Sequence, residues 1–202
     1  MGKRGLFITF EGTEGSGKTT QAELLGEWLA AHDPVVVREP GGTELGEKIR
    51  EVLLYGGLSI DAEAEMYLFM ASRRQLIAEV IAPALSRGQT VIADRYHDST
   101  LAYQGGARGV PTTWPPTFPR PDVTFLLEGP VETGLGRHEQ AGKAKDRLER
   151  ESLEFHRKVA EAYDRIAAAE PKRFVRLDST GSRDKIHLQV RDRLKPLLEG
   201  LD

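Results

Sequence analysis

The chain has 202 residues, a formal net charge of -3 and a sequence pI of about 6.0. This length fits one compact domain, 1–202, and the charge excludes the global basic excess that nucleic acid binding would favour. The absence of cysteine excludes disulfides, thiolate metal sites and a cysteine nucleophile. The apolar run before Glu11 is too short for a signal peptide or a membrane span, so we expect a cytoplasmic protein without a membrane partner.

Five short β-type runs are the expected strands, and most of them are unbroken apolar runs rather than alternating ones. They cover 6–10, 35–37, 90–93, 123–127 and 174–177. Unbroken apolar runs are typical of strands that are buried on both faces. Stretches with helical periodicity lie between the runs, for instance within 20–31, 155–166 and 186–194. This alternation predicts an α/β fold in which helices flank a five-stranded parallel sheet.

The first expected strand leads into a glycine-rich loop with the pattern G-x-x-x-x-G-K-[ST], and a helical stretch follows it. Backbone N–H groups of such a loop can surround a phosphate, and the helix N-terminus adds positive charge. Lys18 would reach the β- and γ-phosphates of ATP, and the Thr19 hydroxyl could ligate Mg²⁺. The residues predicted to bind ATP are Gly12, Thr13, Glu14, Gly15, Ser16, Gly17, Lys18, Thr19 and Thr20. The alternative is a glycine-rich turn without a ligand, and the loop alone does not identify an acceptor.

Asp94 and Arg95 follow the third expected strand. Ligands of open α/β sheets collect at the carboxyl edge of the strands, where this pair would lie. Asp94 could hold Mg²⁺ directly or through water, and Arg95 could bind a phosphate with two parallel hydrogen bonds. The alternative is a structural ion pair.

Two later segments stand out from the alternation of apolar runs and helix-period stretches. Residues 110–122 contain five prolines and predict a stiff extended loop. Residues 137–150 are rich in charge and poor in apolar residues, so we expect them to be solvated and mobile.

The string DRYHDSTLAYQG at 94–105 resembles the signature D-R-[YH]-x-x-S-x-x-A-Y-Q-G of the thymidylate kinase family. Three more segments agree with it, together with the strand PDVTFLL at 121–127. They are FITFEGTEGSGKTTQ at 7–21, REPGGTELGEKIR at 38–50, and DRLE at 146–149 followed by SLEFH at 152–156. The resemblance therefore covers nearly the whole chain. It implies a P-loop nucleoside-monophosphate-kinase-like fold and an enzyme that uses ATP and Mg²⁺ to phosphorylate dTMP to dTDP, a step in dTTP synthesis.

The resemblance also implies a nucleoside site. Phe69 would stack on the thymine ring and Arg73 would donate to its exocyclic oxygen, and their spacing of four puts them on one face of a helix. From periodicity alone, a core Phe69 beside a solvated Arg73 is the alternative. Thr100 and Gln104 would also bind the nucleoside. Tyr103 would lie beneath the sugar, where a ribose 2′-OH would clash.

Three charged residues complete the acceptor site that the resemblance implies. Glu14 would accept a hydrogen bond from the sugar 3′-OH, although a negative charge at a helix start is also favourable without a ligand. Arg50 and Arg95 would hold the acceptor phosphate, a task that suits the planar guanidinium. Without the resemblance, Arg50 would be a surface residue. Glu39 precedes Pro40-Gly41-Gly42, which would let the acceptor approach closely or form a plain turn.

Segment 137–150 resembles the family's lid over ATP. The phosphate loop contains no arginine, so the resemblance is to the bacterial type, in which the lid supplies the arginine that stabilises charge. Arg147 is the first candidate and Arg137 the second, which gives a catalytic set of Lys18, Asp94, Arg95 and Arg147. A solvated charged face is the alternative for the whole segment.

The chain departs from the family between Arg108 and the next strand, where members usually carry a longer helical stretch. Only the proline-rich residues 110–120 stand there. In the family this surface is associated with homodimer contacts, so a homodimer is a weaker expectation than the chemistry. His97 and Met70 are assigned no role. Two rival functions stay open: a kinase of another nucleoside monophosphate or deoxynucleoside, and a P-loop ATPase switch.

Overall fold

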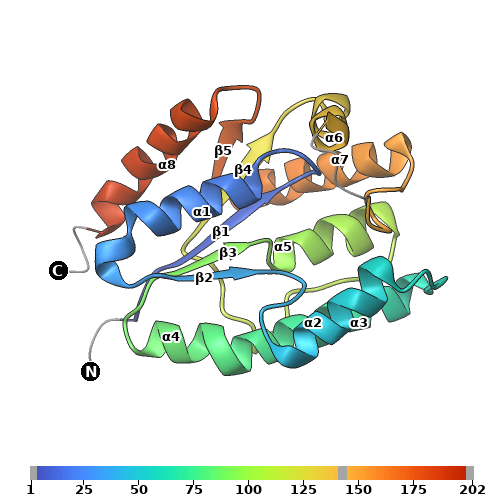
Figure 1. Cartoon of the computed structure of the whole chain (residues 1–202), viewed down its shortest axis with the longest axis horizontal. Coiled ribbons are helices and arrows are strands. Elements are labelled where there is room, and N and C mark those ends of the chain that lie inside the picture. The colour runs from blue at the N-terminus through green and yellow to red at the C-terminus, as the bar shows by residue number, and fades with distance from the viewer. Residues whose placement is uncertain (1–3, 141–144, 199–202) are drawn as a thin grey trace.

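The computed structural model describes residues 4–140 and 145–198, and its centre is a five-stranded parallel sheet (Figure 1). The strands are β1 (Phe7–Gly12), β2 (Val35–Arg38), β3 (Val91–Asp94), β4 (Val123–Glu128) and β5 (Phe174–Asp178). Their order across the sheet is β2-β3-β1-β4-β5, and every neighbouring pair is parallel. The predicted fold class is confirmed, and each predicted strand is present with ends that differ by at most two residues.

Helices connect the strands, and several begin at a side-chain cap. They are α1 (Lys18–Trp28), α2 (Glu44–Arg50), α3 (Ala62–Leu76), α4 (Ala82–Ser86), α5 (His97–Thr100), α6 (Val131–Gln140), α7 (Leu153–Ala169) and α8 (Arg183–Leu198). Short turns of other helical type extend some of them: η1 (Ala30–His32), η2 (Glu51–Tyr55), η3 (Ile77–Ile81) and η4 (Leu101–Ala107). Thr43, Asp61 and Ser152 accept hydrogen bonds from backbone N–H groups in the first turns of α2, α3 and α7.

Both faces of the sheet are covered, as the unbroken apolar strands predict. On one face, α1 and α8 pack against alternate strand residues such as Ile8, Phe10 and Phe125 (Figure 1). On the other face, Phe7 and Val91 pack against α3, η3 and α4, while Leu126 packs with η4 and α7. The predicted loop at 110–122 contains neither helix nor strand, and Phe118 anchors it in the second face.

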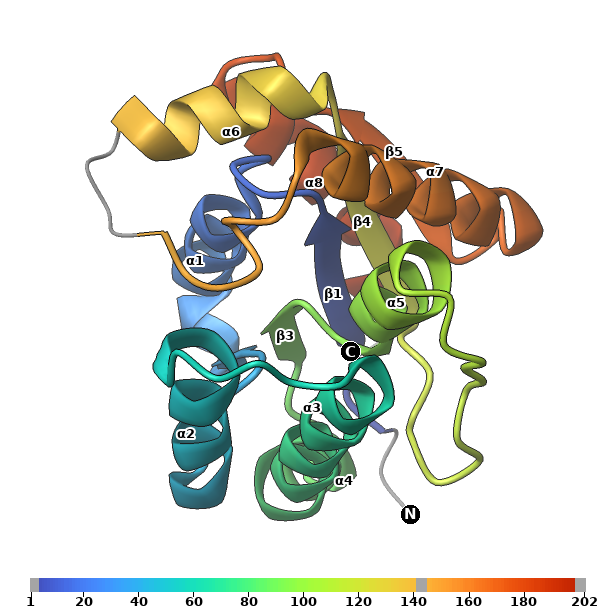
Figure 2. The ribbon, with the colours of Figure 1, turned by 90° about the vertical axis from the view of Figure 1, so that its right-hand side faces the viewer.

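All five strands end at the same edge, and this edge positions the site. Phe10 of β1 pairs with Asp94 of β3, which in turn pairs with Arg38 of β2. The loop after β1, Glu39 after β2 and Arg95 after β3 therefore lie side by side. Figure 2 looks toward this edge, with α2, α3, α5 and α6 around it. No helix within the described residues has the length and apolar character that a membrane crossing requires.

Candidate active site

A cavity of about 580 Å³ opens at the carboxyl edge of the sheet. It brings together most of the residues that the sequence singled out. Those that line it are Glu14, Gly15, Gly17, Lys18, Thr19, Thr20, Glu39, Arg50, Phe69, Arg73, Asp94, Arg95, Thr100, Tyr103 and Gln104. Gly12, Thr13 and Ser16 belong to the same loop but are not among the lining residues, and neither is Arg147.

The loop between β1 and α1 has the strand, loop and helix context that the motif requires, since α1 begins at Lys18. Lys18 is buried, and its Nζ donates to the Thr13 carbonyl oxygen at 2.6 Å and to Ser16 Oγ at 3.3 Å. Burial and the nearby Arg95 lower the pKa of Lys18 to about 8, although Glu14 and Asp94 oppose the shift. An anion bound in this loop would therefore meet a cation whose charge is poorly solvated.

Thr19 and Asp94 lie together on the cavity wall. The Thr19 hydroxyl donates to Asp94 Oδ2 at 2.5 Å. The other carboxylate oxygen, Asp94 Oδ1, is buried and has no hydrogen-bond partner among the described residues. No group of three or more His, Cys, Asp or Glu in the described part of the chain could hold a metal by itself. A hydroxyl and one carboxylate fit Mg²⁺, which keeps several waters and takes its remaining ligands from phosphates.

Arg95, Glu14 and Tyr103 form a contact group on the cavity wall. Arg95 Nη2 donates to Glu14 Oε1 at 2.7 Å, and the Tyr103 hydroxyl donates to the same oxygen at 2.8 Å. Burial alone would raise the pKa of Glu14, but Arg95 and Lys18 outweigh it and lower that pKa to about 2. Arg95 holds a left-handed backbone conformation, φ 72°, which is uncommon for a residue with a Cβ and directs its guanidinium toward the phosphate loop.

Arg73 is a fully buried guanidinium at the far end of the cavity, 1% exposed. Its Nε donates to Glu39 Oε2 at 2.6 Å, Nη1 donates to Thr100 Oγ1 at 2.7 Å, and Nη2 donates to the Tyr96 carbonyl at 3.0 Å. Glu39 Oε1 is buried and without a hydrogen-bond partner in the described residues, so it is available to a ligand. Phe69 lies one turn before Arg73 on α3, as the spacing predicts, and both side chains line the cavity.

Arg50 and Gln104 also line the cavity. Arg50 is half-buried at the end of α2, and its Nη1 donates to the Pro40 carbonyl at 3.0 Å. Gln104 Nε2 donates to Oε1 of the buried Glu65 at 2.8 Å. Gln104 is thus oriented by a carboxylate behind it.

The predicted lid, 137–150, comprises the end of α6, residues 141–144, which lie outside the described residues, and a turn that follows. Arg147 lies in that turn and pairs with Glu65 Oε2 at 2.6 Å, while its Nε donates to the Leu53 carbonyl at 2.7 Å. Arg137, the second candidate, lines the cavity and donates to the Ser179 carbonyl at 2.9 Å. Of the two candidates, Arg137 is therefore the one at the cavity wall in this conformation.

Two buried carboxylates were missed by the sequence reasoning. Glu11 accepts hydrogen bonds from Tyr96 N, Ser99 Oγ and the Tyr163 hydroxyl, and so it fixes the start of α5 against β1. Burial raises the pKa of Glu11 to about 7. Glu65 accepts from Gln104 and pairs with Arg108 and Arg147. Its position four residues before Phe69 on α3 is the signal that could have found it.

A phosphate loop between a buried parallel strand and a helix, with a Thr–Asp pair beside it, defines a P-loop nucleotide-binding protein. The same cavity also contains Arg50, Arg73 and Arg95. These arginines are expected in a P-loop protein that binds a phosphate acceptor as well as a nucleotide. Comparisons with known proteins take the assignment further.

The sequence model of the family described as thymidylate kinase matches residues 10–190. The thymidylate kinase of Desulfovibrio desulfuricans is 42% identical, over 98% of this chain and 100% of that protein. The thymidylate kinase of Deinococcus radiodurans is 45% identical, over 93% and 95%. Among solved structures, the thymidylate kinase of Ehrlichia chaffeensis matches with a TM-score of 0.73 and 31% identity, over 95% of this chain and 99% of that one. The chain therefore belongs to the thymidylate kinase family.

Proposed function

We propose that the chain transfers the γ-phosphoryl group of ATP to dTMP and releases ADP and dTDP. The observation that carries the proposal is a single cavity with a phosphate loop at one end and the pair Phe69 and Arg73 at the other. A protein that only bound or hydrolysed ATP would not need the second end. Family membership supports the choice of dTMP as acceptor.

The donor end acts by positioning and by neutralising charge, since phosphoryl transfer requires little covalent chemistry from the protein. Lys18 would contact the β- and γ-phosphates once they displace its present contacts with Thr13 and Ser16. Thr19 and Asp94 would hold Mg²⁺, which supplies charge neutralisation on the phosphates when it is bound.

At the acceptor end, Phe69 would stack on the thymine ring and Arg73 would donate to its exocyclic oxygen, with Thr100 and Gln104 beside the nucleoside. Tyr103 and Glu14 would face the sugar. The Tyr103 hydroxyl is bonded to Glu14, so that carboxylate is held in place to accept from a 3′-OH. Arg50 and Arg95 would bind the acceptor phosphate and direct it toward the donor.

A lid arginine completes the proposed mechanism by stabilising charge on the group in transfer. Arg137 is supported by its place on the cavity wall, whereas Arg147 would first have to leave Glu65. We infer that 1–202 works as one P-loop kinase domain, with 137–150 as its lid. The homodimer and the cytoplasmic location stay predictions.

The test is ADP release from ATP and Mg²⁺ in a coupled assay, with dTMP, dUMP, dCMP, dGMP and AMP each added alone. We expect strong stimulation by dTMP and weak or no stimulation by the purine nucleotides. Preference for another monophosphate would assign a different kinase. ADP release that is the same without any acceptor would indicate an ATPase switch and contradict the proposal.

A further inference from the structure

His97, the first residue of α5, is a buried histidine that connects the acceptor end of the cavity to the proline-rich loop. It is 1% exposed and does not itself line the cavity. Its Nδ1 lies 3.3 Å from Arg73 Nη1, and its Nε2 lies 3.0 Å from the Thr113 carbonyl oxygen. One ring therefore links a residue that faces the substrate cavity to the main chain of the loop.

The two contacts determine which ring nitrogen carries the proton. A carbonyl oxygen can only accept a hydrogen bond, so Nε2 must be the protonated nitrogen that donates to Thr113. An arginine can only donate, so Nδ1 must be the unprotonated nitrogen that accepts from Arg73. Burial, with Arg73 next in importance, lowers the pKa of His97 to about 3, which keeps the ring neutral in this tautomer. His97 is therefore a fixed acceptor for the guanidinium.

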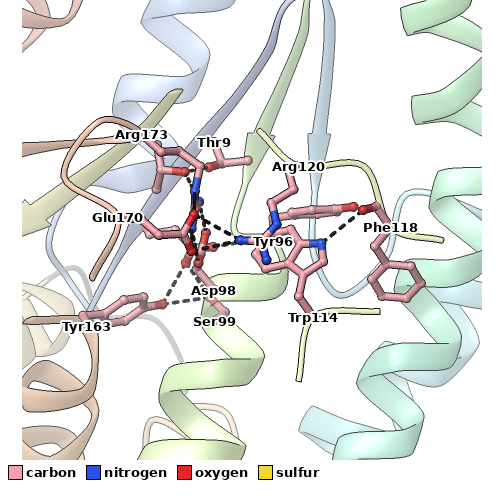
Figure 3. Close-up of polar contacts among 12 residues, drawn as sticks. Thr9, Tyr96, Asp98, Ser99, Trp114, Phe118, Arg120, Tyr163, Glu170 and Arg173 are labelled. Carbon is pink, nitrogen blue, oxygen red and sulfur yellow. Dashed lines mark hydrogen bonds and ion pairs between the residues drawn. The ribbon is translucent and has the colours of Figure 1, made fainter. Parts of the chain in front are cut away.

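The proline-rich loop holds the His97 ring from the side away from Arg73. The indole of Trp114 meets it edge to face with ring centroids 4.8 Å apart, and Phe118 does so at 5.7 Å. Figure 3 shows Trp114 beside Tyr96, with the guanidinium groups of Arg120 and Arg173 close by. Arg120 lies over the indole at 4.4 Å from its centroid.

The loop is itself fastened to the fold. Trp114 Nε1 donates to the Phe118 carbonyl at 3.1 Å, which closes the loop on itself (Figure 3). Arg173 donates to both carboxylate oxygens of the buried Asp98, the residue after His97, at 2.6 and 2.9 Å. The His97 ring is thus held by aromatic contacts and by the Thr113 carbonyl on the loop side, and its Nδ1 contacts Arg73 on the other side.

We propose that His97 is a positioning residue for Arg73, and that the proline-rich loop at 110–120 acts through His97 to set the affinity for the acceptor nucleotide. The inference rests on the proposed function, because it requires Arg73 to contact the acceptor base. His97 does not line the cavity; it is a second acceptor for Arg73 Nη1 beside Thr100, while Glu39 and the Tyr96 carbonyl accept from Nε and Nη2.

Two substitutions test the hydrogen bonds of the two His97 ring nitrogens separately. In His97→Gln, the amide NH₂ can reach the Nε2 position and keep the donor to Thr113, but the acceptor for Arg73 is lost. In His97→Asn, the side-chain oxygen lies near the Nδ1 position and keeps that acceptor, but the donor to Thr113 is lost. Because the contact is long, 3.3 Å, its loss should cost about as much as an ordinary hydrogen bond, so we expect His97→Gln to raise the KM for dTMP by about fivefold to tenfold.

The readout is the split between KM and kcat in the ADP-release assay, measured with wild type and both variants. We expect the KM for ATP and the kcat of His97→Gln to stay near wild type. His97→Asn should raise the KM for dTMP by less than His97→Gln does, because it keeps the acceptor for Arg73 and loses only the hydrogen bond to the loop. Trp114→Ala should also raise the KM for dTMP. In the double variant with His97→Gln, the rise in this KM should be smaller than the product of the two single effects, because both changes act on the same contact. His187→Gln, a half-buried histidine on α8, is the matched control and should change neither KM.

The outcomes distinguish this inference from the proposed function. A wild-type chain that does not phosphorylate dTMP would overturn both. An active wild type with His97→Gln and His97→Asn equal in KM for dTMP would overturn the inference alone, whether both match wild type or both are impaired. A loss of thermal stability without a selective change in the KM for dTMP would also overturn it, because packing alone would then explain His97.

Discussion

Lys18 gives the site a pH dependence that can be measured on ATP binding. Its pKa is lowered to about 8, so Nζ is charged below that pH and increasingly neutral above it in the free protein. A triphosphate prefers the charged form, so its bound state retains the proton. We therefore expect the Kd for an ATP analogue with Mg²⁺ to be constant near pH 7 and to rise above pH 8, approaching tenfold per pH unit. Calorimetric titration between pH 7 and 9.5 measures this.

Lys18→Met is the control, because it keeps the length of the side chain and removes the charge. This variant should bind the analogue weakly at pH 7, show no rise in Kd above pH 8, and lose orders of magnitude in turnover. The same pH slope in Lys18→Met and wild type would assign the titration to another group and contradict the role of Lys18.

At the scale of single residues, sequence spacing predicted which side chains lie together when both residues belong to the same helix. Phe69 and Arg73 could be predicted to share a helix face, since both lie on α3 four residues apart. Periodicity could not predict that Arg73 is buried, because its partners lie on two other segments, Glu39 after β2 and Tyr96 and Thr100 at the two ends of α5. The contact of Arg147 with Glu65 was unpredictable for the same reason, as it joins residues 82 positions apart.

At the scale of elements, the backbone of α6 packs directly against the backbone of the phosphate loop, with no side chain between the two. A Cβ on Gly134 would lie 2.2 Å from the Glu14 carbonyl oxygen, and one on Gly15 would lie 1.9 Å from the Gly134 carbonyl oxygen. Real Cβ atoms do not approach backbone this closely, so either change must displace the phosphate loop or α6. Both glycines are therefore required by this packing.

Gly134→Ala should lower the free energy of unfolding by about 1–3 kcal/mol and reduce kcat/KM, because the displaced loop carries Glu14. Gly136→Ala is the matched control on the same helix: its Cβ would meet no described atom within 4 Å. Alanine at that helical position should be neutral or stabilise by up to about 1 kcal/mol. Urea unfolding compares the two variants, and equal effects would argue against the close approach.

The elements themselves were the most predictable level of the fold. The strands could be found because strands buried on both faces leave short apolar runs, and their ends were off by at most two residues. Local signals did not predict the turns η2, η3 and η4 that extend α2, α3 and α5, because tertiary packing decides how a helix ends. The Gly15 and Gly134 contact depends on the path of α6 and has no signature in sequence.

Considered as a whole molecule, the chain builds the substrate cavity from segments that lie between residue 14 and residue 149. The donor end belongs to the loop after β1, and the acceptor end belongs to α2, α3 and η4. A ligand that binds only the folded chain stabilises it by about 2.7 kcal/mol at a concentration of 100 Kd. For a chain of this size, that corresponds to a rise in Tm of roughly 5–10 °C.

The two ends should therefore give separable thermal shifts. Lys18→Met should lose most of the rise in Tm with the ATP analogue and keep the rise with dTMP. Arg50→Ala should do the reverse, and it is a mild change because this guanidinium is half-buried and donates to a main-chain oxygen, the Pro40 carbonyl, rather than to a buried carboxylate. Differential scanning fluorimetry with each nucleotide alone measures both variants against wild type. If either substitution abolishes both shifts while the unliganded Tm is unchanged, donor and acceptor do not occupy separate ends of the cavity, and the division of residues between ATP and dTMP is wrong.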